Sequence, residues 1–241
     1  MKPLFKHILL LALGLGFVSG APGEVFTNAP GTKFLTNQLD EINLAATNSL
    51  IVLRRHINAS NFQLLGFSNA TEAATATLGK PMLQLLVPFP LLTNYQPGAD
   101  FSSLILPTPA IRPGVGAIVP IMVGADARTA ITLRAVPSAT GAQIDWVEGD
   151  WGHPQVIRNI IATSLAIPAG DLRLGTEPFV VRLPIPRVWL LGYLNKGSEV
   201  TLLATADIPL GAVIHRNEVI PKATMQIWAA EARRYNPGFP N

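Results

Sequence analysis

The chain has 241 residues, contains no cysteine and carries a formal net charge of +3. Two of its 18 basic residues, Lys2 and Lys6, lie in the N-terminal segment, so the remainder nearly balances the 15 acidic residues. This balance leaves no basic surface for nucleic acid, and the missing cysteines exclude a disulfide framework and thiolate metal sites.

The first 20 residues have the pattern of a secretory signal peptide. Lys2 and Lys6 precede an apolar run over residues 8–17, and small residues up to Gly20 form a cleavage site. The run is shorter than the roughly 20 residues that span a bilayer. We therefore expect cleavage after Gly20, no stable transmembrane anchor, and export to the periplasm or the extracellular space. The lack of disulfides favours a bacterial source.

Residues 21–35 have the composition of a linker, and residues 36–241 are expected to form the folded domain. A helix is predicted to begin after a cap at Thr36 or Asn37 and to end near Ile57. Acidic residues in its first turn and arginines in its last turn complement the helix dipole. Its apolar residues recur at spacings of three and four, which is one face of a helix: Leu39, Ile42, Ala46, Leu50, Leu53 and Ile57.

The stretch after this helix resembles a nucleophile turn. Residues 61–67 have the pattern of a strand, and Gly66-Phe67-Ser68-Asn69-Ala70 is close to the G-x-S-x-G turn of α/β-hydrolases. Ser68 would then be the nucleophile, with its acid and base supplied by residues 145–153 or by His215. A small extracytoplasmic hydrolase is therefore the alternative function.

A helix cap explains the same residues with fewer assumptions. Asn69 and Glu72 have the spacing of a capping box, in which each residue bonds the other's backbone N–H group. Ala70 stands where the hydrolase turn has its last glycine, and Gly79 is placed to end a short helix. We therefore interpret Ser68 and Asn69 as a cap.

The rest of the chain is rich in strands and proline. A hairpin is predicted across Gly124-Ala125-Asp126, a short helix from Pro154, and a last helix from Pro221 to about Tyr235. Because strands follow one another instead of alternating with helices, the expected fold class is α+β, an antiparallel sheet with helices packed against it. Strands are expected at residues 82–87, 117–123, 129–136, 143–147, 179–183, 188–194 and 200–205.

Two pairs of segments echo each other at offsets of 95 or 96 residues. GKPMLQLLVPFP (79–90) is similar to GTEPFVVRLPIP (175–186), and VGAIVPI (115–121) is similar to LGAVIHR (210–216). Two related β-rich halves, divided near residue 150, would produce this echo. Chance in a chain with 21 prolines would also produce it, and both explanations stay open.

Several segments resemble a set of uncharacterised bacterial exported proteins. They are SNFQLLGFSNATEAATATLGKPM (60–82), YQPG (95–98), IVPIMV (118–123), FVVRLPIPRVWLLGYL (179–194) and IPKATMQIWAAEARR (220–234). The resemblance covers most of the chain after the leader and implies export and an α+β fold. It assigns no chemical role to any residue.

The densest polar cluster is IDWVEGDWGHP, residues 144–154, with Asp145, Glu148, Asp150 and His153. Close carboxylates can bind Ca²⁺ or share acid–base work. The spacing does not match an EF-hand loop, and one histidine without a companion is a poor transition-metal site. The structural interpretation is a strand end, a turn, and acidic residues beside a helix start. It predicts no metal site, although the cluster is the first place to look for a functional site.

No motif for a nucleotide, phosphate or zinc cofactor occurs, so no cofactor is expected. Two apolar runs, residues 89–95 and 189–193, have aromatic residues that would suit contacts with a protein partner. The candidate contacts are Tyr95, Trp189 and Tyr193, and the partner is either another protein or a second copy of the chain. The sequence therefore predicts an exported, non-enzymatic binding or structural protein.

Overall fold

A computed structural model describes residues 34–105, 115–137, 144–168, 170–173, 176–197, 199–210 and 212–235. The predicted signal peptide and nearly all of the predicted linker lie outside these residues. Within them, no helix combines the length and apolar character needed to cross a membrane.

The first predicted helix is confirmed as α1 (Phe34–His56), which begins two residues before the expected cap. Ile42, Ala46, Leu50 and Leu53 are buried, in agreement with the three- and four-residue spacing. Basic residues occupy its last turn, where the helix dipole favours positive charge. The predicted acidic first turn is wrong, because the helix begins at Phe34 and its first turn contains no acidic residue.

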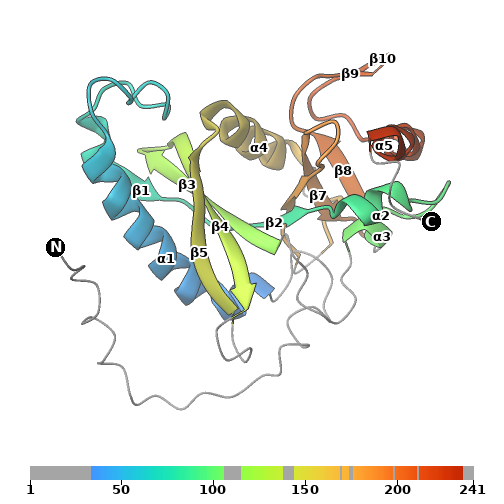
Figure 1. Ribbon diagram of the computed structural model, residues 1–241, viewed down its shortest axis with the longest axis horizontal. Coiled ribbons are helices and arrows are strands. Elements are labelled where there is room, and N and C mark those ends of the chain that lie inside the picture. Colours follow the sequence, from blue (N-terminus) through green and yellow to red (C-terminus); the bar gives the residue numbers. More distant parts are fainter. Residues whose placement is uncertain are drawn as a thin grey trace, which may run out of the picture.

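The strands form a mostly antiparallel sheet, as predicted. Its order is β5-β4-β3-β2-β6-β7-β8, and β1 pairs with β3 outside that path (Figure 1). Among the described strands, β2 and β6 are the parallel neighbours. The bounds are β1 Thr77–Leu78, β2 Met82–Leu86, β3 Val115–Val123, β4 Asp126–Pro137, β5 Ile144–Gly152, β6 Phe179–Arg182, β7 Trp189–Leu194 and β8 Val200–Ala204. A separate pair, β9 (Ile208–Leu210) and β10 (Ala212–Ile214), projects from the body as an arm (Figure 1).

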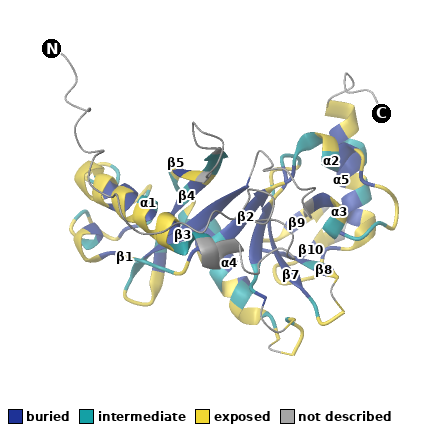
Figure 2. Cartoon of the chain, turned by 90° about the horizontal axis from the view of Figure 1, so that it is seen from below, coloured by how far each residue is buried: buried dark blue, intermediate teal, exposed yellow. Residues whose placement is uncertain are grey.

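Helices cover both faces of the sheet. On one face, α1 shares a core with α2 (Phe89–Thr93), α3 (Ser102–Ile105) and α5 (Lys222–Tyr235), to which α5 contributes buried Trp228. On the other face, α4 (Pro154–Ala166) buries Ile157 and Ile160 in a second cluster. In the burial colours of Figure 2, the strands between these layers are largely buried. The α+β prediction is therefore confirmed.

The strand predicted at residues 61–67 is wrong, because this segment forms a series of turns. The backbone N–H groups of Leu65 and Phe67 bond carbonyl groups only three to five residues earlier. The side-chain oxygen of Asn61 also accepts the Asn58 N–H at 2.8 Å. Side-chain bonds to nearby backbone compete with strand pairing and favour turns. The helix expected after it is only the 3₁₀ turn η2 (Glu72–Thr75), followed by β1.

The polar segment of residues 144–154 also differs from the expectation. The strand does not stop before a turn but continues as β5 to Gly152, with a register shift opposite Thr132 and Leu133. The helix then starts at Pro154, as predicted. The acidic residues of this segment consequently lie on an edge strand, where charges discourage pairing with other chains.

The first pair of echoing segments lies side by side as β2 and β6. Their parallel register pairs Gln84 with Val180 and Leu85 with Val181, partners that are 96 residues apart, as in the sequence echo. The second pair is placed differently, because residues 115–121 belong to β3 whereas residues 210–216 reach into the projecting arm. A division into halves 36–150 and 151–241 therefore remains a prediction.

Candidate functional site

The structure brings together two of the four residues of the predicted polar cluster. His153 follows β5, adopts the left-handed conformation (φ 59°) and stands at the cap position of α4. Its Nε2 atom lies 3.6 Å from Oδ2 of Asp150. Both side chains are about half exposed, so this pair is accessible to solvent.

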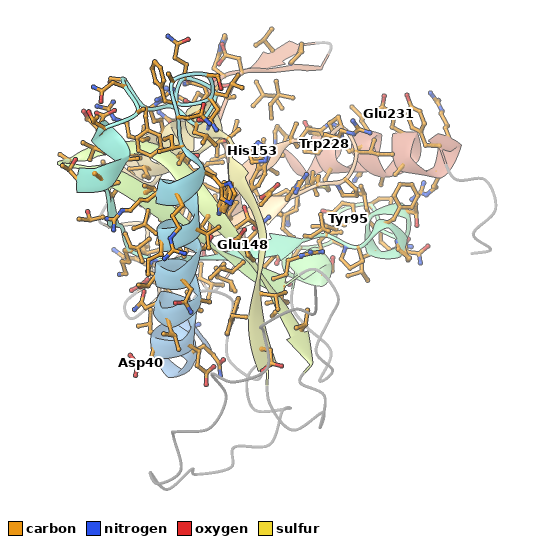
Figure 3. All side chains as sticks on the ribbon, turned by 60° about the vertical axis from the view of Figure 1, so that its left-hand side comes forward. Asp40, Tyr95, Glu148, His153, Trp228 and Glu231 are labelled. Carbon is orange, nitrogen blue, oxygen red and sulfur yellow. The ribbon has the colours of Figure 1, made fainter. Side chains whose placement is uncertain are left out.

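Asp145 and Glu148 do not join this pair. Asp145 pairs with Val136 toward the start of β5 and acts electrostatically on Glu41 of α1. Glu148 lies opposite Leu133, and Figure 3 shows it well separated from His153 along the strand. In the part of the chain that the structure describes, no three His, Asp or Glu residues gather where a metal ion would bind.

An aromatic cluster extends from His153 across the α4 face of the sheet. The rings of His153 and Trp189 are 5.5 Å apart and tilted by 50°. Arg182, the cross-strand neighbour of Trp189, places its guanidinium carbon 4.9 Å from the centre of the indole. Thr205 donates its hydroxyl to the Trp189 carbonyl at 2.6 Å, which ties this cluster to the end of β8.

Beside this cluster, a groove of about 450 Å³ opens between α4 and the base of the β9–β10 arm. We call it the α4 groove. Asp207 lies 3.7 Å from His215 and accepts the Arg216 N–H at 2.9 Å. The residues that line the groove are Gln155, Asn159, Ala206, Asp207, His215, Arg216 and Asn217. Two histidine–aspartate pairs thus belong to the groove and to the adjacent start of α4.

The α4 groove offers more hydrogen-bond donors than acceptors. The side chains of Arg216 and Asn217 have no hydrogen-bond or ion-pair partner among the described residues. Gln155 donates to the side-chain oxygen of Asn159 at 2.8 Å, which fixes Asn159 with its amide nitrogen available. Sequence reasoning missed this site because its residues come from two segments about 50 positions apart, and neither segment has a recognisable motif.

Tyr95 and Tyr193, two of the three proposed partner contacts, are buried inside the chain. Tyr95 donates its hydroxyl to the Ala99 carbonyl at 2.5 Å, and it lies close to α5 and Trp228 in Figure 3. Burial raises the pKa of both tyrosines. In this fold neither ring is exposed to a partner, whereas Trp189 remains partly exposed.

Ser68 lies in a hydrogen-bonded turn just before η2, whose N-cap residue is Thr71 and not Ser68 or Asn69 as predicted. Asn69 accepts the Glu72 N–H at 2.9 Å, and the Glu72 carboxylate accepts the Ser68 N–H at 2.5 Å. Arg128 of β4 donates to the same carboxylate through Nε and Nη2, at 3.1 and 2.6 Å. The Ser68 N–H and Arg128 hold the pKa of Glu72 below its ordinary value, although its partial burial opposes them. The segment before Ser68 is a turn, so the strand that an elbow requires is missing.

A comparison with protein-family models gave no match, and searches of curated proteins and of solved structures found no significant similarity. The resemblance to bacterial exported proteins therefore stays a prediction, and the candidate site rests on the geometry of this chain.

Proposed function

We propose that the protein is an exported, non-catalytic binding protein that holds a small hydroxylated acid, such as a sugar acid, in the α4 groove. The observation that carries this proposal is the groove itself, with the unpartnered side chains of Arg216 and Asn217 in its lining. Export is supported by the N-terminal pattern of Lys2, Lys6 and the apolar run of residues 8–17.

The donors in the groove favour an acidic oxygen group. A guanidinium group presents several N–H donors in a plane and binds carboxylate through two parallel bonds. The amide oxygen of Asn159 accepts from Gln155, and its amide nitrogen has no hydrogen-bond partner among the described residues. Asp207 supplies the acceptor that a hydroxyl group requires, and its negative charge disfavours an acid without hydroxyls close to it.

The same lining supports binding over covalent hydrolysis. None of its seven residues has a hydroxyl or thiol that would act as a nucleophile. The nearby Thr205 hydroxyl is committed to the Trp189 carbonyl. Ser68, the nucleophile of the alternative hypothesis, lies in a turn in which its N–H group donates to Glu72 and the Glu72 N–H group donates to Asn69.

Calorimetric titration of the mature chain with glucuronate, and with glucose as the neutral analogue, tests the proposal. Because the groove is shallow and open, we expect a Kd for glucuronate of about 0.1–1 mM and weaker binding of glucose. A hydrogen bond to a charged group contributes about 1.5–3 kcal/mol, so Arg216→Ala is expected to weaken glucuronate binding about 10- to 100-fold.

Arg234→Ala, an exposed arginine on α5, is the matched control and should leave binding unchanged. If Arg216→Ala bound glucuronate as tightly as the parent chain does, the proposal that the α4 groove binds this ligand would be wrong. Export is tested separately by mass spectrometry of the protein from its native host. An N-terminus at or near Ala21 is expected, and a cytoplasmic chain that starts at Met1 would contradict it.

A further inference from the structure

The outer face of α1 carries no charged side chain along its middle. Residues 42–53 contain no charged side chain, over about 18 Å of helix. Leu44 and Ile51 point away from the core and are 63% and 40% exposed. Figure 2 shows this side of α1 as exposed, opposite the side that packs on the sheet. Exposed helix faces normally carry charged residues, so this face has the character of a contact surface.

The residues of this face are arranged symmetrically about its middle. The midpoint lies between Thr47 and Asn48. Leu44 and Ile51 lie at equal distances on either side of it, as do Asp40 and Arg55 further out. All six are exposed, and their spacings place them on one side of the helix. Thr47 donates its hydroxyl to the Asn43 carbonyl at 2.7 Å, so this donor is already satisfied within the helix.

We propose that α1 is the interface of a symmetric dimer, in which the helix packs antiparallel against α1 of a second copy of this chain. A twofold axis near Thr47 and Asn48 pairs Leu44 with Ile51 of the second copy, and each contact occurs twice. The same axis brings Asp40 of each chain to Arg55 of the other.

The charges at the two ends of α1 support this choice of partner. Glu41 lies near Asp40 and near Asp145 of β5, and no ion pair within the described residues compensates Asp40 or Glu41. Burial, followed by repulsion from Asp145 and Asp40, raises the pKa of Glu41. At the other end, Arg54 is committed to the Ala73 and Ala76 carbonyls.

Arg55, in contrast, has no partner in the part of the chain that the structure describes. In the antiparallel dimer, Arg55 of each copy pairs with Asp40 of the other, so each of these charges gains a partner of opposite sign. One pair of helices buries little area, which places the dimer in the weak, transient class.

Because α1 and α4 cover opposite faces of the sheet, the α4 groove of each copy stays open. The inference does not depend on what the groove binds.

Sedimentation of the full mature chain, from micromolar concentration up to about 1 mM, measures the association directly. We expect a reversible dimer that Leu44→Lys weakens at least about tenfold, because the substitution enters the interface twice. Leu165→Lys is the matched control, since Leu165 is 82% exposed on α4, and it should not change the dimer. Circular dichroism confirms that each variant is folded.

A charge exchange separates this geometry from nonspecific association. Asp40→Arg alone and Arg55→Asp alone should each weaken the dimer, because each creates like-charge contacts at both ends. The double variant Asp40→Arg/Arg55→Asp should restore it, since the exchange keeps every pair opposite in sign. Failure of the double variant to restore a dimer lost in both single variants would overturn the antiparallel pairing.

Cross-linking gives the direction of the helices, because the chain has no cysteine of its own. With a short bis-maleimide reagent, Asn48→Cys near the axis should cross-link two copies efficiently. Leu44→Cys should cross-link poorly by itself, because the axis places its two copies about 10 Å apart along the helices. A chain that remains monomeric at every concentration, or strong linking through Leu44→Cys with none through Asn48→Cys, would refute the proposal.

Discussion

Replacing Glu72 by Gln tests the junction that ties residues 68–72 to the sheet. The carboxylate accepts the Ser68 N–H and two N–H groups of Arg128, while the two side chains are only 13% and 22% exposed. The amide keeps the shape and one acceptor oxygen but removes the negative charge. Arg128 is then left largely desolvated without a counter-charge.

The expected loss follows from these contacts. A hydrogen bond to a charged group contributes about 1.5–3 kcal/mol, and breaking a fully buried pair costs about 3–5 kcal/mol. With part of the pair hydrated and one acceptor retained, we expect Glu72→Gln to lower the free energy of unfolding by about 2 kcal/mol at pH 7. This corresponds to a fall in Tm of about 4–8 °C for a chain of this size.

The loss should depend on pH in one direction. The pKa of Glu72 is lowered in the folded state, so its contribution is fully present above the ordinary value of 4.5. It disappears as pH falls through the lowered folded-state pKa. Urea unfolding at several pH values should therefore show a constant gap between the two proteins from pH 7 down to about 4.5, and a shrinking gap below it.

Glu177→Gln is the control for this experiment. Glu177 pairs with Lys80 at 2.7 Å, but both side chains are well exposed, so its loss should cost less than about 1 kcal/mol. Two results would refute a stabilising ionic contact between Glu72 and Arg128. One is equal stability of Glu72→Gln and Glu177→Gln at pH 7. The other is a difference in free energy of unfolding between the parent chain and Glu72→Gln that stays the same below pH 4.5.

Two further predictions concern packing and metal binding. Gly192→Ala should destabilise the fold by about 1–3 kcal/mol, because the new Cβ would lie 2.4 Å from the buried ring of Phe179. Gly170→Ala meets no atom closer than 3.7 Å and should be nearly neutral in the same urea measurement. Titration with Ca²⁺ or Zn²⁺ should give no binding tighter than about millimolar. Micromolar binding that Asp150→Asn abolishes would instead show that the polar cluster is a metal site.

Some elements could be predicted because their pattern is local. The α1 helix was predicted from apolar residues at spacings of three and four, which are buried in the fold. The hairpin at Gly124 was predicted from two strand-like runs across a short turn, and Gly124 adopts the left-handed conformation that this turn requires. In both cases the structure of the element depends on interactions between residues that are close in the sequence.

The capping residues show the limit of local reasoning. The bond between Asn69 and Glu72 follows from their spacing, and the structure confirms it. The second role of Glu72, as acceptor for Arg128 at 2.6 Å, joins residues 56 positions apart and leaves no local signal. Likewise, residues 61–67 had the pattern of a strand, but hydrogen bonds between the Asn61 side chain and the backbone of His56 and Asn58 favour turns there.

The sequence by itself therefore determined the α+β class, the principal helices and the absence of cysteine. Only the tertiary structure decided the parallel contact of β2 with β6 and the α4 groove, where Gln155 and Asn159 meet Arg216. It also separated Asp145 and Glu148 from His153, because an unbroken β5 spreads these residues along an edge strand. The physical reason is that helices and tight turns depend on bonds within a few residues, whereas strand pairing and groove formation depend on which distant segments pack together.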